Sequence, residues 1–192
     1  MLLESYERKI EAIIFAAGEP IEFIKIAQSL EIDEAAVRRC VGLIRERYAG
    51  QKSPLDIIML GSSVQMSTLP EYGDCIRTAL TLRREAPLSQ AALEVLAAIA
   101  YNQPATRSFV EQVRGVDCSS IVRSLVEKDL VEEAGRLPVP GRPIAYRTTA
   151  NFLRCFGLES LEQLPVMPGS PEEPDGESPA ELDGQMDFSE LY

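Results

Sequence analysis

Histidine is absent from all 192 residues of the chain. Without imidazole, Ser-His-Asp triads, Cys-His pairs and histidine general bases are excluded. The chain also lacks a phosphate-binding loop of the GxxxxGKS or GxxxxGKT pattern. Its adjacent carboxylates, Glu132-Glu133 and Glu172-Glu173, fall in a predicted edge strand and a proline-rich segment, where neither pair would be desolvated. The sequence therefore predicts no catalytic residue and no enzyme activity.

Closely spaced cysteines are missing as well. The four cysteines stand singly at positions 40, 75, 118 and 155, each in a segment whose pattern is otherwise helical. A zinc site would need all four, because there is no histidine, and the wide gaps do not resemble the short paired spacing of such sites. We expect free, mostly buried thiols, with no metal and no cofactor.

Long hydrophobic runs do not occur. No stretch of 18 apolar residues exists, and charged residues interrupt the apolar pattern of the first 18 positions. This pattern predicts neither a membrane span nor a signal peptide, and therefore a cytoplasmic protein. The 45% of apolar residues is still enough to form compact cores.

Basic residues are absent from the end of the chain. Between Val166 and Tyr192 there are eight acidic residues and no lysine or arginine, so residues 1–165 carry 22 acidic against 19 basic residues. The net charge of −11 thus belongs mainly to this tail. Its prolines, glycines and single-sign charge predict a disordered acidic segment over residues 166–192.

The rest of the chain repeats one order of elements. Apolar spacing and capping residues predict three helices, two strands and a further helix over 3–17, 22–30, 34–48, 55–60, 64–68 and 71–82. The same order returns with helices capped by Ser89, Thr106 and Asp117, strands over 130–134 and 144–148, and short helices over 151–156 and 158–164.

Three helices followed by a two-stranded wing are the order of a winged helix. The predicted fold class is therefore mainly α (α+β), with two tandem winged-helix domains. We expect an N-terminal domain over residues 1–82, a linker over 83–87, a C-terminal domain over 88–165 and the disordered acidic tail over 166–192.

Charge favours a polypeptide partner over nucleic acid. A winged helix that reads DNA needs lysine or arginine against the phosphates, but the third helix of the second domain offers only Arg123 and Lys128 among acidic neighbours. The third helix of the first domain has four arginines, Arg38, Arg39, Arg45 and Arg47, yet the sequence pI is about 4.6. A DNA-binding regulator that uses this helix and Arg142 is the alternative interpretation.

The predicted second wing offers a candidate contact. Three prolines and a glycine limit the conformations of residues 138–143, so that ordering this tip on binding costs little, and Arg142 would project as a forked donor. The same run could be only a rigid turn, and Arg114-Gly115-Val116 could be only a helix stop. For self-association the candidates are outward apolar residues of the first domain, Phe15, Phe23 and Ile24, each of which could equally be core.

Three segments between Leu88 and Pro165 stand out: LSQAALEVLAAIAYNQPATR, VRGVDCSSIVRSLVEKDLVEEAGR and PGRPIAYRTTANFLRCFGLESLEQLP. Together they resemble the ScpB proteins, the segregation and condensation subunits of bacterial SMC complexes. The first 80 residues resemble this family more loosely in sequence.

The resemblance implies both a fold and a set of partners. It implies two winged helices, a homodimer formed chiefly through the N-terminal domain, and binding of the kleisin ScpA through the C-terminal domain. ScpA in turn bridges SMC ATPase heads, so that the protein would support chromosome condensation and segregation at the nucleoid and meet DNA only indirectly or weakly. The characteristic family positions, proposed as partner contacts, are Tyr101, Gln103, Pro104, Thr106, Arg114, Gly115, Val116, Gly141, Arg142 and Pro143.

Overall fold

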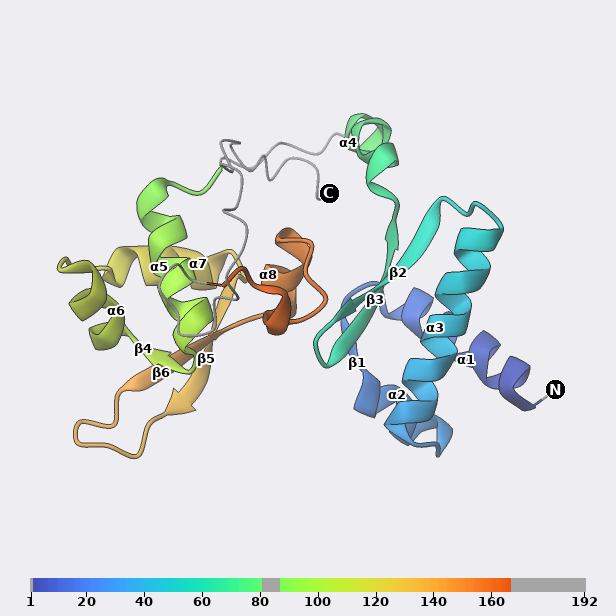
Figure 1. Ribbon diagram of the computed structural model, residues 1–192, viewed down its shortest axis with the longest axis horizontal. Helices are drawn as coiled ribbons and strands as arrows, with labels where there is room; N and C mark the ends of the chain where they lie inside the picture. The colour runs from blue at the N-terminus through green and yellow to red at the C-terminus, as the bar shows by residue number, and fades with distance from the viewer. Residues whose placement is uncertain (1, 81–86, 167–192) are drawn as a thin grey trace, which may run out of the picture.

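A computed structural model describes residues 2–80 and 87–166, and the helices and strands form two units (Figure 1). Most of the predicted linker and nearly all of the predicted acidic tail lie outside these residues. The first unit contains α1 (Leu2–Ala17), β1 (Ile21–Glu22), α2 (Phe23–Leu30), α3 (Glu34–Gly50), β2 (Leu55–Leu60), β3 (Ser63–Thr68), the 3₁₀ helix η1 (Pro70–Tyr72) and α4 (Gly73–Leu80).

The second unit repeats the order helix, strand, helix, helix, strand, strand. It contains α5 (Gln90–Asn102), β4 (Ala105–Thr106), α6 (Arg107–Arg114), α7 (Ser119–Glu127), β5 (Val131–Arg136) and β6 (Ile144–Thr148), followed by α8 (Ala150–Cys155) and η2 (Leu161–Gln163). The chain is therefore a mixed protein of helices and small antiparallel sheets. None of the helices in the described ranges is long and apolar enough to cross a membrane.

Each unit has a three-stranded antiparallel sheet with the last strand in the middle. The strand orders are β1-β3-β2 and β4-β6-β5. The outer strands β1 and β4 have two residues each and pair through Ile21 with Val64 and through Ala105 with Tyr146. Strands this short have no readable alternation, so the sequence pattern predicted only the two longer strands of each sheet.

Most predicted helix starts are confirmed by their caps. Backbone N–H groups donate to Asp33 Oδ1 at 2.6 Å and to Thr106 Oγ1 at 3.2 Å. The prediction for α7 was wrong by one residue, because Cys118 and not Asp117 is the N-cap. Asp117 instead accepts a hydrogen bond of 2.7 Å from the Ser119 N–H, so it serves the same helix end from one position upstream.

One predicted helix is shorter than the periodicity indicated, and the expected end of another lies outside the described residues. The helix expected over 158–164 is the single 3₁₀ turn η2, and the helix expected over 71–82 begins as the 3₁₀ turn η1 and is described as helical only to Leu80. Pro165 directly follows the first of these segments. A residue before proline is disfavoured in helical conformation, which opposes a full helix there.

Two separate clusters of buried apolar residues form the cores. The first contains Ile10, Ile14, Phe23, Ile26, Ala27, Val37, Cys40, Val41, Ile44, Ile57 and Val64. The second contains Leu60, Val95, Leu96, Ile99, Ala100, Ala105, Val110, Cys118, Val122, Leu125, Leu130, Val131, Phe152 and Leu153. Each fully buried large side chain contributes roughly 1.5–3 kcal/mol, and so the two clusters account for most of the stabilisation.

One expected surface residue belongs to the core. Phe23 is 0% exposed, and the Arg38 guanidinium lies 3.9 Å from its ring centroid. The expectation that Phe23 faces outward is therefore wrong: it is the first residue of α2, and its side chain turns beneath α3. Phe15 and Ile24, in contrast, are 71% and 46% exposed.

A polar cluster ties α1 to α3. Glu11 Oε2 accepts from Arg47 Nη2 at 2.6 Å, and Glu11 Oε1 accepts from the Tyr48 hydroxyl at 2.5 Å. Burial alone would raise the pKa of Glu11, but these hydrogen bonds and the Arg47 charge outweigh it, so the pKa lies below its usual range. Burial and the hydrogen bond to Glu11 raise the pKa of Tyr48 to about 12.

We predict that Glu11→Gln lowers the free energy of unfolding by about 1 kcal/mol at neutral pH. Because the folded pKa of Glu11 is lowered, its stabilisation is present above the unfolded value of 4.5 and is lost as the pH falls through the folded pKa. Urea unfolding at a series of pH values should show the two proteins converging in acid. A difference that stays constant from neutral pH into acid would contradict this assignment.

Candidate partner-binding surface

The C-terminal end of α5 and the turn that follows it contain three of the predicted contact residues, Tyr101, Gln103 and Pro104. Gln103 follows α5, and its Oε1 accepts hydrogen bonds from the Thr148 N–H at 2.8 Å and the Thr148 hydroxyl at 3.0 Å. The Gln103–Pro104 peptide bond is cis. Gln103 therefore fastens the end of α5 to β6, which is a structural role whether or not it also contacts a partner.

Tyr101 is engaged by the chain itself. Its hydroxyl donates to the Pro165 carbonyl at 2.6 Å, and its side chain remains partly exposed. A cavity of about 410 Å³ lies here, lined by Ala100, Tyr101, Gln103, Leu161, Glu162, Leu164, Pro165 and Val166. The segment 161–166 thus shares the surface on which a partner would meet Tyr101.

The second group lies on α6 and just after it. Thr106 caps α6, and Arg114 near its end donates through Nε and Nη2 to Glu94 Oε2 of α5, at 3.2 and 2.9 Å. Gly115 has φ +72°, and its N–H donates to the Glu111 carbonyl at 2.8 Å, which ends the helix in the left-handed conformation that glycine favours. Val116 beside it is 54% exposed.

The third group forms the β5–β6 loop. The Leu137 N–H donates to the Pro143 carbonyl at 3.0 Å, the Arg142 N–H to the Val139 carbonyl at 2.9 Å, and Arg136 Nη1 to the Arg142 carbonyl at 3.0 Å. Gly141 and Arg142 both have positive φ, at +84° and +40°. The backbone of the tip thus forms hydrogen bonds within the loop, and the tip is exposed.

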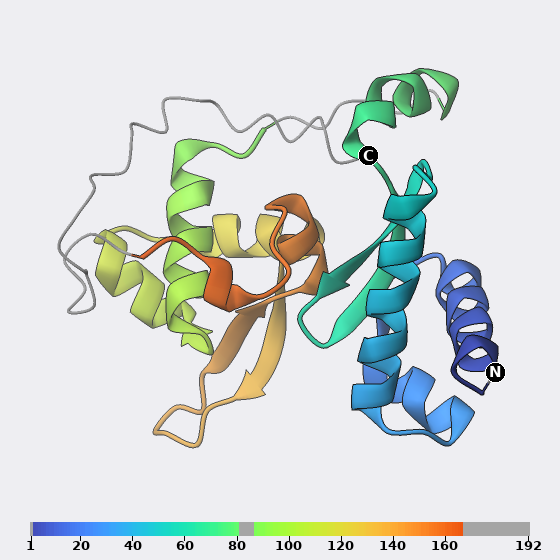
Figure 2. The ribbon, with the colours of Figure 1, turned by 45° about the vertical axis from the view of Figure 1, so that its right-hand side comes forward.

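The three groups do not converge on one pocket. The β5–β6 loop projects away from the helices of the second unit in both ribbon views (Figures 1 and 2). Gln103 and Pro104 line a cleft to which neither the end of α6 nor the wing tip contributes a residue. A partner that uses all three groups must therefore extend over the surface of this unit.

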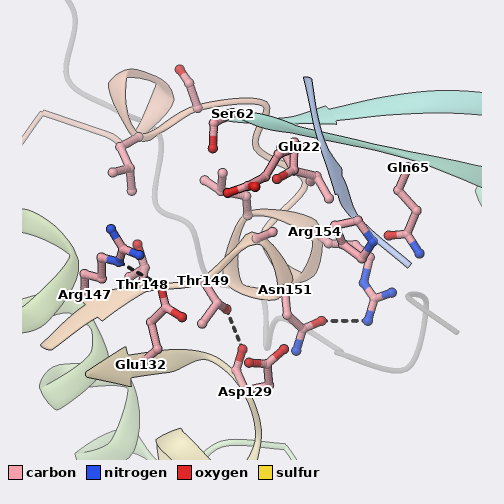
Figure 3. A pocket seen from close by; sticks show the side chains of 18 of the residues that line it. Glu22, Ser62, Gln65, Asp129, Glu132, Arg147, Thr148, Thr149, Asn151 and Arg154 are labelled. Carbon is pink, nitrogen blue, oxygen red and sulfur yellow. Dashed lines mark hydrogen bonds and ion pairs between the residues drawn. The ribbon is translucent and has the colours of Figure 1, made fainter. Parts of the chain in front are cut away.

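A larger cleft, which was not expected from the sequence, lies between the two units. Its volume is about 1160 Å³, and Figure 3 shows its walls: Glu22, Ser62 and Gln65 from the first unit and Asp129, Glu132, Arg147, Thr148, Thr149, Asn151 and Arg154 from the second. Ion pairs lie within it, Lys25 with Glu22 at 3.2 Å and Arg147 with Glu132 at 2.7 Å. The apolar periodicity of the sequence indicates packing within one unit. It therefore could not predict a cleft whose walls come from both units.

The arginines of α3 are largely paired with carboxylates. Arg38 contacts Glu34 at 2.7 Å, Arg45 contacts Glu159 at 2.8 Å and Arg47 contacts Glu11 at 2.6 Å. Paired guanidinium groups are poor counter-ions for phosphate, because a phosphate would first have to displace a carboxylate. This geometry weighs against the DNA-binding alternative.

The thiols show no feature of a reactive site. Burial raises the pKa of Cys40 and, likewise, of Cys118, which disfavours the nucleophilic thiolate. None of the four cysteines forms a disulfide, and residues 2–80 and 87–166 hold no cluster of three or more potential metal ligands.

We predict that Gly115→Ala destabilises the protein by about 1–2 kcal/mol, because an L-residue is strained at φ +72°. Gly42→Ala is the matched control: Gly42 lies inside α3 and no atom lies within 4 Å of an added Cβ, so alanine should be neutral or stabilising by up to about 1 kcal/mol. Thermal unfolding compares the two. Equal melting temperatures for the two variants would contradict the assigned role of Gly115 as the helix stop.

Comparison with known proteins identifies one family over most of the chain. The model for "Segregation and condensation complex subunit ScpB" matches residues 8–167. A segregation and condensation protein B from Caldanaerobacter subterraneus subsp. tengcongensis is 45% identical over 159 residues, which cover 83% of this chain and 95% of that relative.

Solved structures also match. A crystal structure of ScpB from Mycobacterium tuberculosis is 28% identical, with a TM-score of 0.39, and the match covers 81% of this chain and 97% of that one. A crystal structure described as a dimer of the ScpB N-terminal domain complexed with ScpA peptide is 20% identical, also with a TM-score of 0.39, over 41% of this chain and 99% of that one.

Proposed function

Because the chain belongs to the family of segregation and condensation complex subunit ScpB, we propose that it is a non-enzymatic interaction subunit of a bacterial SMC–kleisin complex. It dimerises and binds the kleisin ScpA, and through ScpA it supports the SMC ATPase in chromosome condensation and segregation. The observation that carries this proposal is the family match over residues 8–167. The match to the family model therefore spans nearly all of the residues that the structure describes.

Each unit is proposed to be a winged helix. The order α1-β1-α2-α3-β2-β3 recurs as α5-β4-α6-α7-β5-β6, with the same strand order in both sheets, and this supports the assignment. The domains are then residues 1–82 and 88–165, joined at 83–87. Two buried clusters, one centred in each half with Leu60 of the first half contributing to the second cluster, support this division.

The two domains are proposed to bind different partners: the first binds a second copy of the chain, and the second binds ScpA. Phe15 and Ile24, exposed apolar residues of the first unit, are the candidates for the homodimer contact, while Phe23 is removed from that set because it is buried. The second unit binds ScpA through Val116, the wing tip at Arg142 and the end of α5. These are exposed or partly exposed groups on an otherwise folded surface, as interface anchors require.

The protein is proposed to work in the cytoplasm and to reach the nucleoid through the complex. Support comes from charge: residues 1–165 are slightly acidic, and Arg38, Arg45 and Arg47 are already paired with carboxylates. Direct contact with DNA is therefore weak or absent. A transcriptional regulator would need a basic groove-reading helix, and neither α3 nor α7 provides one.

We predict that Arg142→Ala weakens ScpA binding by about tenfold, the effect of losing roughly 1.4 kcal/mol at an arginine anchor. Arg123→Ala, which removes the same charge from an exposed site on α7, is the matched control and should bind normally. Isothermal titration of ScpA into each protein measures the difference, and circular dichroism checks that both remain folded.

Two outcomes would count against this role of the wing tip. Unchanged affinity in Arg142→Ala would show that the tip is only a turn. Equal losses in both variants would show that net charge, and not the placement of Arg142, governs binding.

A further inference from the structure

Strand β2 makes apolar contacts on both faces, and each face packs against a different unit. Ile57 belongs to the buried cluster of the first unit, and Met59 packs against it. Leu60 is 3% exposed but belongs to the cluster of the second unit, against which Ile58 packs. Since side chains alternate along a strand, one face of β2 completes its own unit and the other completes the neighbouring one.

Polar contacts at the turn after β2 reinforce this packing. The Gly61 N–H donates to the Glu159 carbonyl at 2.7 Å, and Arg45 Nη1 lies 2.8 Å from Glu159 Oε1. Glu159 of the second unit is thus held by both its backbone and its side chain. The Asp56 carboxylate lies 3.8 Å from Arg45 Nε and helps to orient that guanidinium.

The turn itself fits closely. Gly61 has φ +65°, and a Cβ added there would lie 3.5 Å from Leu153 Cδ1 of α8. Arg38 Nη1 donates to the Gly61 carbonyl at 3.5 Å from the side of the first unit. In Figures 1 and 2 the turn between β2 and β3 points toward α8 and the segment that follows it.

From these contacts we propose that the β2–β3 hairpin is an intramolecular latch. The hairpin docks against a site on the second unit that we call the latch socket. Leu153 of α8 and Glu159 form this socket. Docking holds the two units in one arrangement and builds the 1160 Å³ cleft, whose walls come from both units. This inference does not depend on the proposed function, because it rests only on contacts within the chain.

The latch links the surfaces of the two units. Undocking would expose Ile58 and Leu60 on one side and Leu153 on the other, and would take the two cleft walls apart. Because both units belong to one chain, the effective concentration of hairpin and socket is on the order of millimolar, so a modest contact area is enough. Any partner that binds the latched form more tightly must therefore stabilise the cleft. By the same coupling, a stabilised cleft must strengthen the binding of that partner.

Hydrogen exchange of the full chain, followed by mass spectrometry, tests the latch. We expect Leu60→Asp to increase exchange at the Gly61 amide and in α8 by about tenfold or more, because the buried carboxylate opposes docking. Leu43→Asp, the same substitution at a 42% exposed leucine of α3, is the control and should leave both segments unchanged. Equal exchange of these segments in the two variants would overturn the latch.

A second pair of variants guards against loss of folding in Leu60→Asp. Glu159→Arg places two cations together at a partly exposed site, so it should speed exchange at Gly61 while the β2–β3 ladder stays protected. Arg45→Glu combined with Glu159→Arg should restore part of the protection at Gly61. The recovery should be incomplete, because the glutamate at position 45 would lie near the Asp56 carboxylate. Unchanged exchange in Glu159→Arg, or no recovery in the double variant, would overturn the assignment of this ion pair.

Dilution separates a latch within one chain from docking between two copies. Protection at Gly61 should be the same after about tenfold dilution if the contact is intramolecular. Protection that falls on dilution would show docking in trans and overturn the proposal.

Discussion

The packing of β2 on both faces is the constraint from which the arrangement of the two described units follows. Ile57 and Met59 face the first core, while Ile58 and Leu60 face the second. A strand with one solvated face would alternate apolar and polar residues, but this one has the near-continuous apolar run LDIIML. The hairpin therefore has a second role besides closing its own sheet, and the cleft between the units exists because of it.

The secondary structure could be predicted largely from local signals. Caps such as Asp33 and Thr106 and the apolar spacing of α1 and α5 act within a few residues, and the structure confirms these elements. The two-residue strands β1 and β4 were missed because pairing to a distant strand, and not their own composition, makes them strands. Helical spacing does not show which neighbour covers a side chain, so the sequence could not decide whether Phe23 faces outward or belongs to the core, where the structure places it.

The site was harder to predict, for a physical reason. Contacts that join distant parts of the chain, such as Tyr101 with Pro165 or Arg45 with Glu159, leave no periodic trace in the sequence. The family resemblance supplied positions and a binding partner, but not the atoms that each position contacts within the chain. In the structure several of those positions, including Gln103, Arg114 and Gly115, have clear roles in holding the second unit together. A residue can serve both purposes, but its structural role is the one that the geometry explains.

This ScpB-family chain acts by binding another polypeptide, the kleisin ScpA. Native mass spectrometry of the purified full chain mixed with ScpA from the same organism measures this binding. We expect a stable assembly whose mass contains ScpA and more than one copy of this chain. A correctly folded protein that forms no complex with ScpA at any mixing ratio would contradict it.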